Sequence, residues 1–282
     1  MKKVWINKKL FDMDKARVSI FDRGFMYGDG VFESMRSYAG VVSKIDEHLG
    51  RLARSLKTTG IKSPYSNSYL KKEIYRLLGV NNLKNAYIRL TITRGEGRFG
   101  VEHKDVFKPS VVIIAKEFDR YPDWMFEKGI SAHIVSTRQN DLSPLAGVKS
   151  LNYLNYIMAR FEAKKSGCEE AIILNTKGRI VEAVTSNIFI VKRNAIVTPL
   201  ITDGALPGVT RAVIIKIAKK LGFRVIEKSL SPKELMNSDE IFLTNSLAEV
   251  LPVTKIDRKP IGAGIPGHVT NLLRISYQNQ IK

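Results

Sequence analysis

Cysteine and long apolar runs are the two features that this sequence has least of. Cys168 is the only cysteine, so no disulfide can form within the chain. No stretch approaches the roughly 18 uninterrupted apolar residues that a membrane helix needs. Residues 1–15 contain several lysines, but no apolar run of signal-peptide length follows them. We therefore expect neither a membrane span nor secretion, and we expect the protein to be cytoplasmic.

Positive charge dominates the ionisable residues. The chain has 46 lysines and arginines against 27 aspartates and glutamates, which gives a net charge of +19. A field of this sign attracts phosphates, acidic metabolites or nucleic acid. The basic residues are scattered, however, and no zinc-finger cysteines, RRM-like aromatic strand or basic tail organises them. The pattern therefore disfavours nucleic acid as a partner.

The length of 282 residues, with 44% hydrophobic and 26% charged residues, predicts a globular protein of two lobes. In the first lobe, residues 47–60 and 66–78 carry apolar side chains at spacings of three and four, which predicts two helices. The strands expected there are 3–6, 18–21, 31–38, 86–93 and 110–115. This α+β domain is expected to span residues 1–115, and the proline-bearing stretch 116–129 is expected to be a linker.

The second lobe is expected to span residues 130–282. An amphipathic helix is predicted at 153–166, with Gly167 as its stop signal, and a second helix at 209–221. The strands expected before the second helix are 130–136, 171–174, 179–183, 187–191 and 195–198. A strand, a short helix, another strand, a hairpin and a last helix are predicted to follow.

Residues 206–211, Leu-Pro-Gly-Val-Thr-Arg, form a candidate phosphate site. Pro207 and Gly208 precede a well-patterned helix, so free backbone N–H groups and the positive end of the helix dipole meet at Val209 and Thr210. Proline and glycine also begin many helices that bind nothing. The hexapeptide alone therefore leaves both interpretations open.

Two charged residues are ambiguous in the same way. Glu182 lies among β-branched and apolar residues, where an ionised carboxylate is costly unless a group such as a pyridinium N–H pairs with it. It could equally face outward from a strand. Lys149 precedes a predicted helix and could be an ordinary surface lysine. Neither residue is decisive when it is considered alone.

Six segments considered together resemble the class IV aminotransferases, the fold-type-IV pyridoxal-phosphate enzymes, in order and along nearly the whole chain. They are residues 22–33 (DRGFMYGDGVFE), 48–52 (HLGRL), 149–153 (KSLNY), 182–189 (EAVTSNIF), 206–211 (LPGVTR) and 242–253 (FLTNSLAEVLPV). The resemblance implies an α+β fold with a small N-terminal lobe and a larger C-terminal pseudo-barrel lobe. It also implies a homodimer.

The resemblance implies a role for each matched residue. Lys149 is expected to hold pyridoxal 5'-phosphate in a Schiff base and to carry the proton between Cα and C4'. Glu182 is expected to keep the ring nitrogen protonated, and Tyr153 to bond to the 3'-oxygen. The residues expected at the phosphate are Arg51, Val209, Thr210 and Ser246. Arg51 would bind it through a forked contact and the helix start would bind it through backbone N–H groups.

The substrate pocket is expected to include Tyr27, Phe32, Arg36 and Arg89, because relatives use these positions to line the pocket or bind a carboxylate. Arg98 is also expected there, because it lies in the Gly-rich loop 94–100, which can reach the site. Arginine suits a carboxylate because its planar fork reaches both oxygens. We favour Arg89 for this role because it lies within a predicted strand. No metal site is expected.

Three activities share this scaffold, and a fold resemblance cannot choose among them. Residues 87–90 (YIRL) and 248–252 (AEVLP) resemble branched-chain aminotransferases, which move the amino group of an L-amino acid to 2-oxoglutarate. Residues 32–34 (FES) and 244–246 (TNS) resemble aminodeoxychorismate lyase, which makes p-aminobenzoate and pyruvate. D-amino acid transamination ranks third, because the arginine and histidine loop of that group is not matched. We expect the branched-chain transaminase, with the lyase as the alternative.

Overall fold

The computed structural model describes residues 2–102 and 108–281. These residues form two compact units. The first runs to Asp119 and also includes Val148–Asn152, and the second comprises Arg120–Gly147 and the chain from Tyr153 onward. Within the described residues, no helix is long and apolar enough to cross a membrane.

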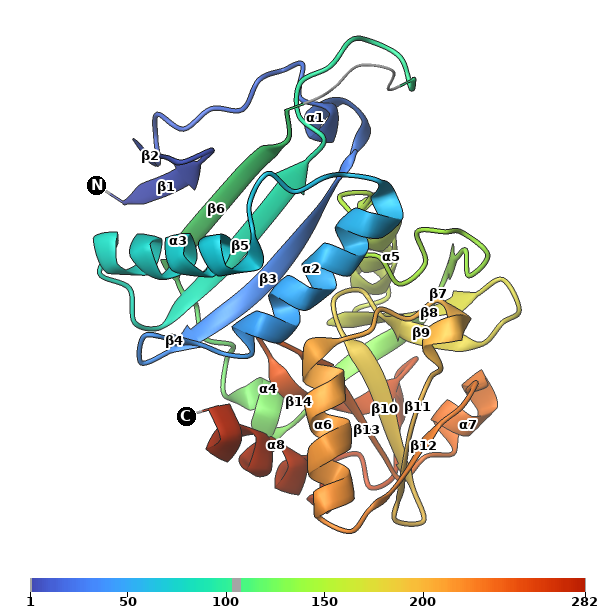
Figure 1. Ribbon diagram of the computed structural model, residues 1–282. Helices are drawn as coiled ribbons and strands as arrows, with labels where there is room; N and C mark the ends of the chain where they lie inside the picture. The colour runs from blue at the N-terminus through green and yellow to red at the C-terminus, as the bar shows by residue number, and fades with distance from the viewer. Residues whose placement is uncertain (1, 103–107, 282) are drawn as a thin grey trace. The chain divides into compact units, whose positions relative to one another are not determined.

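A six-stranded sheet forms the first unit, in the order β2-β1-β6-β5-β3-β4. Figure 1 shows α2 and α3 lying across one face of this sheet, where α2 packs on β3 and α3 packs on β1 and β6. The elements are β1 Lys3–Ile6, β2 Lys9–Asp12, α1 Arg23–Tyr27, β3 Gly30–Tyr38, β4 Val41–Val42, α2 Ile45–Thr59, α3 Asn67–Val80, β5 Ala86–Thr93 and β6 Ser110–Glu117.

The two faces of this sheet differ because the side chains of β3 and β5 alternate along each strand. One set, which includes Met35, Ile88 and Leu90, is fully buried in the core under the helices. The other set, which includes Phe32 and Arg89, lies on the opposite face. A chemical site can therefore form on that face without disturbing the core.

A nine-stranded sheet forms the second unit, in the order β12-β11-β10-β13-β14-β7-β8-β9 with β15 beside β14. The sheet curls, because Ile180 in the last strand pairs with Leu230 just beyond the first. The strands are β7 Ile130–Gln139, β8 Glu170–Asn175, β9 Ile180–Ala183, β10 Asn187–Lys192, β11 Ala195–Thr198, β12 Arg224–Glu227, β13 Glu240–Asn245, β14 Glu249–Ile256 and β15 Lys259–Pro260. The expected pseudo-barrel is therefore confirmed.

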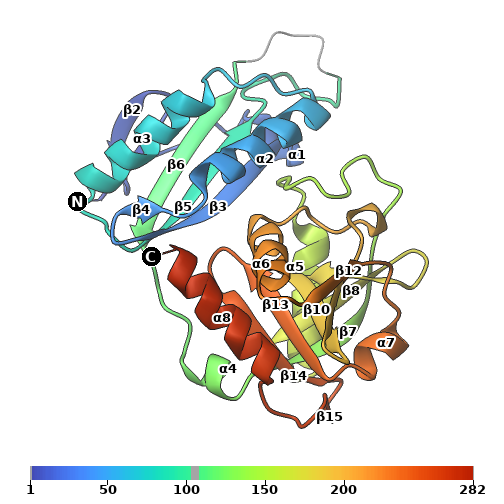
Figure 2. The ribbon, with the colours of Figure 1, turned by 60° about the horizontal axis from the view of Figure 1, so that its bottom comes forward.

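Helices cover the outside of this pseudo-barrel. Figure 2 shows α6 and α8 side by side over β13, where Phe189 and Phe242 stack with ring centres 4.9 Å apart. The helix α5 packs on β7 and β8. The helical segments are α4 Trp124–Glu127, α5 Leu154–Lys165, η1 Ile201–Asp203, α6 Val209–Lys220, α7 Pro232–Met236 and α8 His268–Ile281.

One predicted strand is wrong. Residues 18–21 have β-branched and aromatic side chains but form no strand, and Val18, Ile20 and Phe21 are exposed. A strand needs a neighbouring strand for its backbone, and no ladder is formed here: Phe21 O accepts from Gly97 N at 3.2 Å, and the isolated bridge from Asp22 to Glu96 lies just beyond the stretch. The short elements β2, α1 and α4 were not predicted.

Residues 148–152 belong to the first unit, although they fall within the range 130–282 expected for the second lobe. The change from one unit to the other at Asp119 falls inside the stretch 116–129 that was expected to be a linker. Residues 148–152 then return to the first unit, because their backbone pairs with the start of β3. Phe32 N donates to Lys149 O at 3.0 Å, and Leu151 N donates to Gly30 O at 2.9 Å. This pairing places Lys149 beside β3.

Candidate active site

Lys149 lies in the first unit against the aromatic ring of Phe32. Its Nζ is 4.6 Å from the centre of that ring, and the guanidinium carbon of Arg89 is 3.8 Å from the same centre. Two cations thus share one ring on the sheet face opposite α2 and α3.

A buried ionic cluster lies on the other face of the same sheet, where α2 packs. Glu33 is fully buried, and its carboxylate accepts hydrogen bonds from Arg51 Nε at 2.8 Å and Arg51 Nη2 at 2.6 Å. His48 Nδ1 lies 2.7 Å from the same carboxylate. Burial alone would raise the pKa of Glu33, but the bonds and charge of Arg51, with the bond to His48, lower that pKa to about 2.

The role predicted for Arg51 stays a prediction, but its geometry is now defined. Its Nε and Nη2 both donate to Glu33, so in this structure the forked contact of Arg51 is with that carboxylate. Sequence reasoning missed Glu33 and His48 as members of this cluster. Two signals were available: a glutamate within an apolar strand, and a histidine three residues before an arginine on one helix face.

Glu182 lies in the second unit, on β9, and is buried with 5% of its surface exposed. The outward-facing interpretation is therefore excluded. Its Oε1 accepts a hydrogen bond from the Tyr156 hydroxyl at 3.1 Å. Its Oε2 accepts from the Leu206 N–H at 3.0 Å and lies 3.4 Å from Asn187 Nδ2. Sequence reasoning gave no role to Tyr156, because the residue fits the helical pattern around it.

The helix α6 begins shortly after Leu206, whose N–H donates to the Glu182 carboxylate. Gly208 is the extended N-cap residue and no side chain caps the helix, while Val209 and Thr210 are both buried. A Cβ added at Gly208 would meet Asn187 Oδ1 at 1.9 Å, so any larger residue there would require the Asn187 side chain to move. The helix start therefore offers backbone N–H groups without a competing side chain.

Residues 244–246 span the end of β13 in the same unit, since the strand ends at Asn245 and Ser246 begins the turn after it. Asn245 Oδ1 accepts from the N–H groups of Leu247 and Ala248, and Asn245 Nδ2 donates to Ser186 Oγ at 2.8 Å. This turn places Ser246 at its apex. Among the described residues, Thr244 Oγ1 is buried and finds no hydrogen-bond partner.

A family model described as amino-transferase class IV matches residues 30–256 of the chain. The chain belongs to this family. The match covers both units, and it contains Lys149, Arg51, Glu182 and the start of α6. The two-lobed α+β class IV fold expected from the sequence is thereby confirmed.

Relatives of this class IV aminotransferase cover almost its full length. It is 40% identical over 278 residues to a Methanocaldococcus jannaschii protein provisionally named as a branched-chain-amino-acid aminotransferase, across 98% of this chain and 96% of the relative. It is 33% identical to D-alanine aminotransferase of Bacillus licheniformis, across 99% and 97%. It is 32% identical to aminodeoxychorismate lyase of Bacillus subtilis, across 99% and 94%.

Solved structures of class IV enzymes match equally well. The branched-chain amino acid aminotransferase of Escherichia coli superposes with a TM-score of 0.96 at 32% identity, across 100% of this chain and 95% of that chain. The T.th. branched-chain amino acid aminotransferase, solved with pyridoxamine 5'-phosphate, superposes with a TM-score of 0.95 at 29% identity, across 99% and 94%.

The structure groups some of the expected substrate residues and separates others. Phe32 and Arg89 lie together with Lys149, and Arg36 lies on the same sheet face against the rings of Tyr38 and Phe118. Tyr27, at the end of α1, accepts a hydrogen bond from Gly100 N at 2.9 Å, and Arg98 is exposed in the loop after β5. Phe32 and Arg89 are therefore the expected substrate residues that lie beside Lys149.

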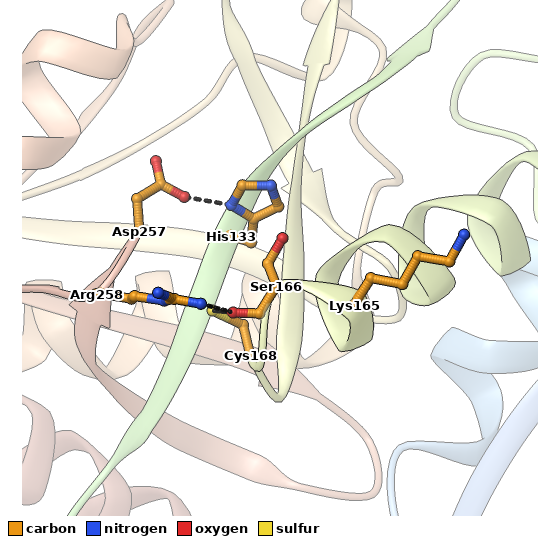
Figure 3. Close-up of a pocket in the computed structure, with 6 residues that line it drawn as sticks. All are labelled: His133, Lys165, Ser166, Cys168, Asp257 and Arg258. Atoms are coloured by element: carbon orange, nitrogen blue, oxygen red, sulfur yellow. Dashed lines mark hydrogen bonds and ion pairs between the residues drawn. The ribbon is translucent and has the colours of Figure 1, made fainter.

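A cavity of about 370 Å³ in the second unit is separate from these residues. Figure 3 shows its lining, with His133 bonded to Asp257 and Arg258 directed at the Ser166 carbonyl. The lining residues are His133, Lys165, Ser166, Cys168, Asp257 and Arg258. None of the predicted site residues lines this cavity.

Proposed function

We propose that this class IV aminotransferase is a pyridoxal-phosphate-dependent transaminase of branched-chain type, which moves the amino group of an L-amino acid to 2-oxoglutarate. The observation that supports this cofactor is the buried carboxylate of Glu182, which accepts hydrogen bonds from Tyr156 and Leu206. The branched-chain preference rests on the M. jannaschii relative at 40% identity and on the E. coli structure.

The residues of each unit fit the groups of this cofactor. A buried carboxylate suits a protonated ring nitrogen, because an unpaired charge is costly in an apolar surrounding. The uncapped start of α6 and the buried hydroxyl of Thr244, which has no hydrogen-bond partner among the described residues, suit an anionic phosphate. When bound, pyridoxal phosphate supplies a positive ring that withdraws electrons from the substrate Cα.

Each side chain then has a defined task. Lys149 Nζ would hold the cofactor covalently until a substrate amino group replaces it, and the amine released in this way would move the proton of the substrate Cα. Glu182 pairs with the ring nitrogen. Tyr153, whose hydroxyl lies 3.4 Å from Val184 O, bonds to the 3'-oxygen. The phosphate would be bound by Arg51, by the backbone at Val209 and Thr210, and by Ser246.

The substrate carboxylate is assigned to Arg89, because it is the arginine that shares the Phe32 ring with Lys149. The ring of Phe32 offers an apolar surface to an aliphatic side chain. Tyr27, Arg36 and Arg98 complete the proposed pocket. The substrates in this proposal are small-molecule amino acids and 2-oxo acids.

Aminodeoxychorismate lyase is the second candidate, and one contact favours it. The hydroxyl of Ser34 lies 3.4 Å from the hydroxyl of Tyr87, on the sheet face that carries Phe32 and Arg89. Polar groups beside the Arg89 guanidinium suit an oxygen-rich ring substrate better than an aliphatic side chain.

A product assay separates the candidates. The purified protein, loaded with pyridoxal phosphate, is incubated with L-leucine and 2-oxoglutarate, with D-alanine and 2-oxoglutarate, or with aminodeoxychorismate. We expect glutamate from the L-leucine mixture and a cofactor band near ~410 nm. Abundant p-aminobenzoate without glutamate would replace the transaminase by the lyase. A protein that stays colourless with added pyridoxal phosphate would contradict both.

A homodimer is part of this proposal, and α5 carries a surface that suits it. Leu154, Ile157, Met158 and Phe161 are exposed at spacings of three and four, so they form one apolar stripe along the helix. Contiguous exposed apolar side chains mark interaction surfaces in soluble proteins. A second copy of the chain would cover this stripe.

We expect the double variant Ile157→Glu with Phe161→Glu to be monomeric, because two buried charges at such a contact would be left without partners. Light scattering after size-exclusion chromatography measures the mass. The control is Ile275→Glu, which places one charge at a similarly exposed position on α8 and should leave the mass unchanged. A double variant that is folded by circular dichroism and still dimeric would show that the stripe is not the contact.

A further inference from the structure

Tyr156 has no role in the proposed chemistry so far, yet it contacts the residue assigned to the ring nitrogen. It lies in the first turn of α5, and its ring packs on that of Tyr153 with centres 4.9 Å apart. Its hydroxyl donates to Glu182 Oε1 at 3.1 Å. The other oxygen of Glu182, Oε2, accepts hydrogen bonds from Leu206 N and Asn187 Nδ2, which follow Glu182 in the sequence.

The position of one proton decides whether a ring nitrogen becomes an effective electron sink. When a pyridine nitrogen and a carboxyl group share a proton, the proton resides on the more basic partner. Hydrogen bonds to a carboxylate stabilise its ionised form and make it less basic. Donors around Glu182 therefore favour a positive ring beside a negative carboxylate over a neutral pair.

We propose that Tyr156 is a positioning residue, which keeps Glu182 ionised and fixes the orientation of its carboxylate toward the ring nitrogen of the cofactor. This inference rests on the proposed function, because it takes the cofactor from there. Tyr156 acts through Glu182. The phenol of Tyr156 is a side-chain donor to Oε1, so a substitution can remove it, whereas the Leu206 N–H that donates to Oε2 is a backbone group.

The phenol is suited to a permanent donor role. Burial, and then the charge of Glu182, raise the pKa of Tyr156 far above its usual value. The phenol therefore keeps its proton throughout the working pH range. Tyr153 supports the ring of Tyr156 from the preceding turn, so that the hydroxyl is held at Glu182 by packing as well as by its hydrogen bond.

The test compares two forms of the cofactor on the wild-type apoprotein and on Tyr156→Phe. One form is pyridoxal phosphate, and the other is its deaza analogue, in which carbon replaces the ring nitrogen. We expect Tyr156→Phe to weaken binding of pyridoxal phosphate about tenfold, since a hydrogen bond to a charged group is worth about 1.5–3 kcal/mol. Binding of the deaza analogue should change less than about twofold, because it has no ring N–H for Glu182 to pair with.

Turnover gives an independent readout. We expect kcat for the amino acid substrate to fall about 10- to 100-fold in Tyr156→Phe while KM stays nearly constant, because the lost stabilisation is that of the developing carbanion. Tyr277→Phe is the matched control, since Tyr277 is another buried phenol of the same unit. It should leave kcat and both affinities unchanged.

Three outcomes would overturn the inference. They are an equal loss of affinity for both forms of the cofactor, no loss for either form, and a kcat equal to that of the wild type. Tyr156→Met, which fills space without a donor, is measured alongside in case the phenylalanine variant does not fold. Failure of the proposed function is distinguishable, because the wild-type protein itself would then bind no pyridoxal phosphate.

Discussion

Replacement of Lys149 by alanine is expected to lower kcat by about 10²- to 10⁴-fold, the range that a positioned acid–base group contributes. In the proposed function, Lys149 is both the covalent anchor of the cofactor and the proton carrier, so alanine removes both tasks. Its location supports this, because backbone bonds from Phe32 and Leu151 fix the segment against β3. Steady-state kinetics measure the loss. Borohydride reduction followed by mass spectrometry should show an adduct in the wild type and none in Lys149→Ala.

The control for this experiment is Lys164→Ala, which removes an exposed lysine from the last turn of α5. We expect this variant to keep both the kcat and the reducible adduct of the wild type. An adduct that persists in Lys149→Ala would assign the covalent bond to another lysine. Retained activity in that variant would contradict the proposed function of Lys149.

Local patterns predicted the regular elements well where a strand has one buried face. In β5, buried and half-buried residues alternate along Ala86–Ile92, and the predicted bounds 86–93 are confirmed. The failure at residues 18–21 has the opposite cause. Their side chains favour a strand, but their backbone has no neighbouring strand to pair with, and β propensity alone does not supply one.

The contacts that define the candidate site depend on residues far apart in the chain, which periodicity cannot reveal. Glu33 meets Arg51 across 18 positions, and Tyr156 meets Glu182 across 26. In each case the sequence contains a costly feature, a carboxylate within an apolar strand, but does not identify the partner. The resemblance to class IV aminotransferases singled out Glu182 and Arg51, but it assigned no role to Glu33, His48 or Tyr156.

The placement of Lys149 illustrates the same limit. The segment 148–152 follows Gly147 within a stretch that otherwise belongs to the second unit, and its sequence predicts no strand. Its return to the first unit is made by backbone bonds to Gly30 and Phe32, which any residue type could form. Only the folded backbone therefore shows that Lys149 and Phe32 are neighbours.

The buried cluster of Glu33, His48 and Arg51 should make the first unit sensitive to acid. The pKa of Glu33 is about 2 in the folded protein against an ordinary value of 4.5. Because the folded pKa is the lower one, the unfolded chain binds the proton more tightly. The stabilisation is therefore complete above about pH 4.5 and is lost as the pH falls toward 2. It amounts to about 3 kcal/mol, at 1.36 kcal/mol for each pKa unit.

We expect Glu33→Gln to lower the free energy of unfolding of this unit by about 3–5 kcal/mol at pH 7, because Arg51 is left as a buried charge without its carboxylate. The variant should also lose the steep decline of stability between pH 4.5 and 2. Denaturant unfolding followed by Trp5 fluorescence in a Trp124→Phe background reports the first unit, since Trp5 is fully buried in its core.

Asp46→Asn is the control for the acid-sensitivity experiment. Asp46 is an exposed carboxylate on α2, the helix that carries Arg51, and it pairs with Lys71. An exposed pair contributes about 0–1 kcal/mol, so this variant should follow the wild-type profile at every pH. If Glu33→Gln also followed that profile, the cluster would not be the source of acid sensitivity. The variant Glu33→Gln could also keep the wild-type pH dependence of stability and yet bind pyridoxal phosphate more weakly. That result would show that Glu33 orients Arg51 but does not make the unit sensitive to acid.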